Sequence, residues 1–140
     1  MVVVDASLMV AALVDSGSEG EWAEEVVARN ALAAPELLLV ETSNILRRLQ
    51  LAGELSTLEA TSAQRDSLRL DVELFPFSPF ADRVWALREN LTSYDAWYVA
   101  LAEALQCPLV TLDRRLGRAS GPSCEIVTGP EEVVPGPGAG

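Results

Sequence analysis

The 140-residue chain contains no histidine and no lysine, and all ten of its basic residues are arginine. Without histidine there is no Ser-His-Asp or Cys-His catalytic machinery and no imidazole metal ligand. Without lysine there is no Schiff-base chemistry and no P-loop lysine. Chemistry by this chain must therefore come from carboxylates, together with a hard cation bound through oxygen.

Cysteine is scarce, and long apolar runs are missing. Cys107 and Cys124 stand alone, which is not a zinc-binding pattern, and two cysteines do not build a secreted disulfide scaffold. We expect both to be reduced core residues of a cytoplasmic protein. The longest apolar run, residues 8–14, is far shorter than the roughly 20 residues of a membrane-spanning helix. The N-terminus lacks the basic segment of a signal peptide, so no membrane partner is expected.

Acidic residues, by contrast, are abundant. The chain has 21 Asp and Glu against ten Arg, which gives a formal net charge of −11. Apolar residues make up 49% of the chain and charged residues 22%, a composition typical of a folded globular protein. We expect one domain over residues 1–130, because this length supports a core of its own. Residues 131–140 are rich in proline and glycine, which predicts a flexible tail.

Apolar runs alternate with helical patterns along the whole domain. Strands are expected at 2–4, 31–34, 72–75, 109–112 and 125–128, and helices at 6–14, 18–29, 35–51, 56–70, 78–90, 92–104 and 114–118. Capping boxes at Ser18–Glu21 and Ser56–Glu59, and Pro35 in a first turn, mark three helix starts. The alternation predicts an α/β fold, a three-layer α/β/α arrangement with a mostly parallel central sheet.

Two acids follow predicted strands directly. Asp5 comes after three valines, and Asp113 stands at the end of the strand over 109–112. In parallel sheets, ligands bind outside the carboxyl ends of the strands, which favours a shared site for this pair. The alternative for each is an N-cap of the helix that follows.

Two further acids lie within predicted helices. Glu41 follows four apolar residues and has Asn44 one turn later, whereas most helical glutamates are only solvated. Asp95 stands three residues after Thr92, the spacing of a capping box, and that box alone would explain it.

The four segments that carry these acids resemble, in order, the four acidic motifs of the PIN domain family. They are VVVDAS (residues 2–7), PELLLVETSNIL (35–46), YDAWYVALA (94–102) and LVTLDRRL (109–116). The resemblance covers essentially the whole chain apart from the tail. It is greatest to the VapC-type toxins of bacterial toxin–antitoxin modules, which are single PIN domains of about this length.

The resemblance implies a PIN-like nuclease fold and a Mg²⁺- or Mn²⁺-dependent endoribonuclease that cleaves single-stranded or loop RNA. Converging carboxylates need such a cation, because two unit charges about 4 Å apart cost roughly 4 kcal/mol at an effective dielectric near 20. On this hypothesis Asp5 and Asp95 bind the metal, and Asp113 is a third or water-mediated ligand. Glu41 orients or deprotonates the attacking water. A metal-activated water leaves 5′-phosphate and 3′-hydroxyl ends.

Other side chains near the motifs have supporting parts in this hypothesis. Ser7, Asn44 and Thr111 are expected to hold the carboxylates in place. Arginines follow two of the motifs, and they either contact RNA phosphates or pair with the many surface acids. These arginines are Arg47, Arg48, Arg114, Arg115 and Arg118.

The family resemblance also implies two protein partners, a cognate VapB-type antitoxin and a second copy of the chain in a homodimer. An antitoxin tail is expected to put an arginine among the carboxylates and to bind apolar grooves between helices. Trp22, Trp85, Trp97 and Tyr98 are candidates for such a groove or a dimer face, and core packing is the alternative use.

Two other functions fit parts of the sequence. A receiver domain or a haloacid-dehalogenase-like phosphatase also places acids on a parallel sheet, but both need a lysine, and the phosphatase needs an acid where Ser7 stands. A non-catalytic PIN-fold module that sequesters a protein or RNA partner would not need all four acids.

Overall fold

In the computed structural model, which describes residues 1–130, five parallel strands form one sheet in the order β3-β2-β1-β4-β5. The strands are β1 (Val2–Val4), β2 (Leu32–Pro35), β3 (Val72–Phe75), β4 (Leu109–Val110) and β5 (Ile126–Val127). The helices are α1 (Ala6–Val14), α2 (Ser18–Arg29), α3 (Leu37–Leu51), α4 (Thr57–Ser67), α5 (Ala81–Ala86), α6 (Ser93–Leu105) and α7 (Arg114–Gly117), with a 3₁₀ turn, η1 (Ser78–Phe80), before α5. The predicted α/β class with a parallel sheet is confirmed.

The middle of the sheet is covered on both faces. All three valines of β1 are at most 1% exposed, as expected for a parallel strand with helices above and below it. β1 pairs with β2 on one side and β4 on the other, so the first residues of the chain form the centre of the sheet. Asp5 and Thr111 therefore leave adjacent strands at the same edge.

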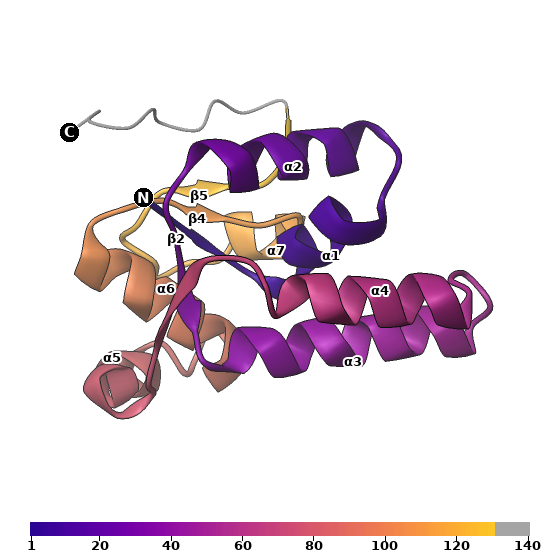
Figure 1. Cartoon of the computed structure of the whole chain (residues 1–140). Coiled ribbons are helices and arrows are strands. Elements are labelled where there is room, and N and C mark those ends of the chain that lie inside the picture. Colours follow the sequence, from indigo (N-terminus) through magenta and orange to yellow (C-terminus); the bar gives the residue numbers. More distant parts are fainter. Residues whose placement is uncertain (131–140) are drawn as a thin grey trace.

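The helices form two groups around this sheet (Figure 1). Helix α6 packs against β1, β2 and β4, with α5 and η1 beside it. Helix α1 packs against α2, α3 and α4, and α3 and α4 run side by side as a hairpin. These two groups bring α1, α3 and α6, which carry or follow three of the four motif acids, around one end of β1.

Several predicted boundaries are wrong by a few residues. Pro35 ends β2 instead of opening a helix, and Glu36 is the N-cap of α3. Ser18 is the first residue of α2 and the N-cap is Gly17, so the predicted box with Glu21 does not cap it. The helix expected over 78–90 is a 3₁₀ turn followed by the short α5. The box at Ser56 is confirmed.

The two cysteines are unpaired in the structure, as expected. Cys107 and Cys124 are free thiols, partly buried against the main core. Among residues 1–130, no helix has the length and apolar character needed to cross a bilayer. The predicted tail, residues 131–140, lies outside the described residues.

Glu103 on α6 binds Arg83 on α5 and Ser123 in the loop before β5. Both of its carboxylate oxygens bind the guanidinium of Arg83, at 2.7 and 3.0 Å, and Oε2 also accepts from the backbone and hydroxyl of Ser123 at 2.7 and 2.8 Å. The hydrogen bonds from Arg83, followed by those from Ser123, lower the pKa of Glu103 to about 2. This network fixes the loop before β5 to α5 and α6.

We expect Glu103→Gln to lower the free energy of unfolding by about 1–2 kcal/mol at pH 7, a value reduced for the partial exposure of Arg83. Because the folded-state pKa is depressed, this stabilisation is fully present above pH 4.5 and is lost as the pH falls toward 2. Urea unfolding of wild type and variant at pH 7 and pH 2.5 measures it. The exposed pair of Arg29 and Glu25 provides the control, since Glu25→Gln should change little at either pH.

Candidate active site

Asp5 is held at the end of β1 by three donors. Its Oδ1 accepts from the Ser7 hydroxyl at 2.7 Å and from the backbone N–H of Leu8 at 3.1 Å, and its Oδ2 accepts from the hydroxyl of Thr111. The bond to Leu8 makes Asp5 the N-cap of α1, so the capping alternative is true as well. Two of the three expected supporting residues, Ser7 and Thr111, thus fix the direction of this carboxylate.

Ser7 and Thr111 also join the loop after β4 to this cluster. Their hydroxyl oxygens lie 3.2 Å apart. The Ser7 oxygen accepts from the backbone N–H of Leu112, and the Thr111 oxygen accepts from that of Asp113. Because β1 and β4 are neighbours in the sheet, the first and fourth motifs form one hydrogen-bonded unit.

Asp113 is the N-cap of α7 and is paired with an arginine. Its Oδ1 accepts from the backbone N–H of Arg115 at 3.0 Å and from Nε of the same residue at 3.2 Å, and its Oδ2 accepts from Nη2 at 2.9 Å. These hydrogen bonds from Arg115 lower the pKa of Asp113. Asp113 is therefore ionised over the whole physiological pH range.

Asp95 lies in the first turn of α6. Its backbone N–H donates to the side chain of Thr92, which confirms Thr92 as the N-cap. Asp95 also lines a cavity of about 270 Å³ together with Asp113 and Arg115. The helix cap and the cavity thus use different parts of the same residue.

Glu41 faces α6 from α3. The hydroxyl of Tyr98, a residue only 2% exposed, donates to Glu41 Oε1 at 2.7 Å. Tyr98 is three residues after Asp95, so both lie on the same face of α6. The third and second motifs are joined by this bond.

The four carboxylates act on one another electrostatically. Burial, with a smaller contribution from the charge of Glu41, raises the pKa of Asp5 from 3.8 to about 6 against its hydrogen bonds. Burial and the charge of Asp95 raise the pKa of Glu41, and burial and the charge of Asp113 raise that of Asp95. The structure thus brings all four predicted residues into one electrostatic cluster.

The donor set of this cluster suits a hard cation, because it consists of carboxylate and hydroxyl oxygens. Within residues 1–130, no three Asp, Glu, His or Cys side chains are gathered closely enough to hold one ion between them. Mg²⁺ commonly keeps several waters and uses only one or two protein carboxylates. The cavity beside Asp95 and Asp113 has room for such a hydrated ion, so these two acids fit the cation.

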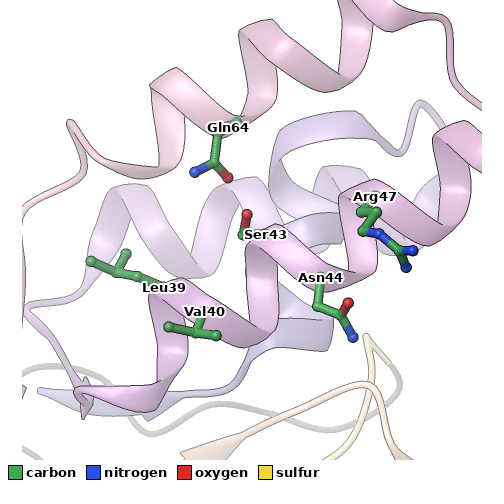
Figure 2. A pocket seen from close by; sticks show the side chains of 6 residues that line it. All are labelled: Leu39, Val40, Ser43, Asn44, Arg47 and Gln64. Carbon is green, nitrogen blue, oxygen red and sulfur yellow. The ribbon is translucent and has the colours of Figure 1, made fainter.

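Asn44, the third expected supporting residue, lies elsewhere. It is exposed on α3 and lines a groove of about 420 Å³ with Leu39, Val40, Arg47 and others, across from Gln64 on α4 (Figure 2). Figure 2 shows Asn44 and Arg47 on the same stretch of α3. The i, i+3 spacing from Glu41 therefore did not place Asn44 among the carboxylates.

Tyr98 is buried in the main hydrophobic core, as the core-packing alternative predicted, but the bond from its hydroxyl to Glu41 was not predicted from the sequence. Its spacing from Asp95 was the available sign of its place at the site.

We expect Tyr98→Phe to lower kcat for RNA cleavage by about tenfold with little change in KM, because Glu41 loses the donor that orients it. Steady-state kinetics on a short RNA measures this. Tyr94→Phe on the same helix is the control, since Tyr94 is 62% exposed.

Comparison with known proteins shows the family to which this chain belongs. The PIN domain family matches residues 2–122. Ribonuclease VapC9 of Mycobacterium tuberculosis is 40% identical over 130 residues, which cover 93% of this chain and 99% of the relative. The chain therefore belongs to the PIN domain family, and within that family to the VapC ribonucleases.

Solved structures show the same fold. PAE2754 from Pyrobaculum aerophilum superposes with a TM-score of 0.67 at 26% identity, covering 91% of this chain and 83% of that protein. VapBC2 from Rickettsia felis, solved bound to a DNA fragment from its promoter, gives a TM-score of 0.61 at 16% identity. The match covers 90% of this chain and 97% of that chain. The fold is thus shared with structures of low sequence identity.

Proposed function

We propose that this chain is a Mg²⁺- or Mn²⁺-dependent endoribonuclease and the toxin of a toxin–antitoxin pair, acting on single-stranded or loop RNA in the cytoplasm. The observation that carries the proposal is the electrostatic cluster of Asp5, Glu41, Asp95 and Asp113 at the end of β1 and β4. Burial, with a smaller contribution from neighbouring negative charges, raises the pKa of three of these acids, and a bound cation would offset both effects. The VapC ribonuclease relatives support RNA as the substrate.

The proposed ligands are Asp5 and Asp95, with Asp113 binding directly or through water. When bound, the cation supplies a water of lowered pKa and positive charge for the phosphate oxygens. Ser7 and Thr111 fix the Asp5 carboxylate in its direction, so that no reorganisation is needed when the cation and substrate arrive.

Glu41 is the proposed base. Tyr98 occupies its Oε1, which leaves Oε2 to accept a hydrogen bond from the attacking water and then its proton. The raised pKa of Glu41 makes it a stronger base than a solvated glutamate. Because water and not the ribose 2′-hydroxyl attacks, the products carry 5′-phosphate and 3′-hydroxyl ends.

The proposed protein partners are a VapB-type antitoxin and a second copy of the chain. A second groove, of about 450 Å³ between the α1–α2 connection and α4, has apolar lining from Leu13, Val14 and Leu58 and an acidic rim. The rim residues are Asp15, Glu24, Glu59 and Asp66. Apolar lining and acidic rim both suit a basic amphipathic segment of an antitoxin.

Expression in a bacterial host, with and without the cognate antitoxin, tests the proposed function. We expect growth arrest and new RNA 5′ ends from wild type alone, and neither from Asp5→Ala or Asp95→Ala. If both variants still arrest growth and cut RNA at the wild-type sites, the assignment of the site is wrong. If wild type leaves all RNA intact, the activity itself is wrong.

A further inference from the structure

The guanidinium of Arg115 forms a bidentate ion pair with the carboxylate of Asp113. Its Nη2 lies 2.9 Å from Oδ2 and its Nε 3.2 Å from Oδ1, so the guanidinium covers both oxygens that Asp113 offers to a cation. The backbone N–H of Arg115 adds a third bond to Oδ1. A divalent ion and this guanidinium compete for the same oxygens.

The same arginine acts on a second acid of the cluster. Arg115 and Asp95 line one cavity, and the positive charge of Arg115 partly offsets the burial that raises the pKa of Asp95. The Arg115 side chain is 82% exposed, so neither packing nor burial fixes it in this position. It can leave Asp113 without disturbing the core.

The neighbouring arginine is placed differently. Arg114 Nη1 lies 3.7 Å from Glu19 Oε2 on α2 and so points away from the carboxylate cluster toward that helix. Two adjacent residues of the fourth motif thus carry the same charge, and Arg115 is the one whose ion pair is with a motif acid.

We propose that Arg115 competes with the divalent cation for the Asp113 carboxylate and is displaced when the cation binds. The released guanidinium then binds a phosphate of the RNA. The idea rests on the proposed metal-dependent ribonuclease function and adds a chain residue that controls how the site is loaded. A released guanidinium suits a phosphate, because it presents paired N–H donors to two oxygens.

Calorimetric titration of Mn²⁺ into the full chain, without RNA, tests the competition between Arg115 and the cation for Asp113. We expect Arg115→Ala to bind Mn²⁺ about two- to fivefold more tightly than wild type, since an exposed ion pair is a weak competitor. Arg115→Lys, which keeps the charge but loses the paired donors, should lie in between. Arg114→Ala, which removes the same charge one residue away, should bind as wild type does.

Steady-state cleavage of a short RNA at saturating Mn²⁺ tests the contact between Arg115 and an RNA phosphate. We expect Arg115→Ala to raise KM several-fold. An unchanged Mn²⁺ affinity in Arg115→Ala, or an equal gain in Arg114→Ala, overturns the competition. An unchanged KM overturns the phosphate contact. If wild type binds no Mn²⁺ and cuts no RNA, the proposed function fails together with this inference, which is a different result from either.

Discussion

Asp95→Asn is expected to lower the rate of RNA cleavage by at least about a hundredfold while the protein stays folded. The substitution removes a carboxylate that we propose as a metal ligand, and removing one electrostatic partner of a transition state commonly costs about 10²–10³ in kcat. The backbone N–H of Asp95, not its side chain, makes the bond to Thr92, so the α6 cap survives. Single-turnover cleavage of a labelled RNA measures the loss.

The same substitution should not destabilise the protein. Burial and the charge of Asp113 raise the pKa of Asp95, so ionisation costs folding free energy as the pH rises through that raised pKa. Asparagine removes this cost, and we expect a melting temperature at pH 7.5 equal to or above that of wild type. Asp71→Asn, at an exposed acid before β3, is the control for both measurements. A folded Asp95→Asn variant with wild-type cleavage would contradict the site.

Divalent cation is expected to raise the melting temperature by roughly 5–10 °C at pH 7.5. A ligand at 100 times its Kd stabilises the folded state by about 2.7 kcal/mol, which corresponds to a shift of this size in a chain of 140 residues. The physical reason is that the cation offsets the cost of burying ionised carboxylates near one another, and burial is the main cause of the raised pKa of three of them. Thermal melts with Mn²⁺ and with EDTA measure the shift.

The stabilisation by Mn²⁺ should be larger at pH 7.5 than at pH 5. Without metal, the pKa of Asp5 is about 6 in the folded protein and 3.8 as its ordinary value, so below pH 6 the folded protein holds a proton there. Protons then compete with the cation, and the Mn²⁺-induced shift should shrink strongly between pH 7.5 and pH 5. A shift of equal size at both pH values, or an undiminished shift in Asp95→Asn, would show that the ion binds elsewhere.

The sequence allowed the fold class and the convergence of the four acids to be predicted for identifiable reasons. Val2–Val4 is an uninterrupted β-branched run, which is typical of a strand buried on both faces, and it forms the centre of the sheet. Acids that follow adjacent parallel strands must meet at one edge, and Asp5 and Asp113 are joined there through Thr111. Capping and site formation were posed as alternatives, yet both acids cap a helix and also lie at the proposed site.

What could not be predicted depended on contacts between distant segments. Glu41 and Tyr98 are 57 residues apart, and only the folded positions of α3 and α6 bring the hydroxyl to the carboxylate. Helical spacing alone suggested Asn44 as a helper of Glu41, but the rotation of α3 directs it to a groove instead. Pro35 was assigned to a helix because proline is common in first turns, whereas here β3 pairing continues β2 through that residue.

Analysis of the product ends after cleavage of one synthetic RNA by the purified full chain tests the central claim most directly. We expect cleavage that requires Mg²⁺ or Mn²⁺, stops with EDTA, and leaves 5′-phosphate and 3′-hydroxyl ends. These ends would follow from the proposed roles, in which Asp5 and Asp95 hold the cation and Glu41 orients the attacking water. Cleavage that persists in EDTA, or products with 2′,3′-cyclic phosphate ends, would contradict it.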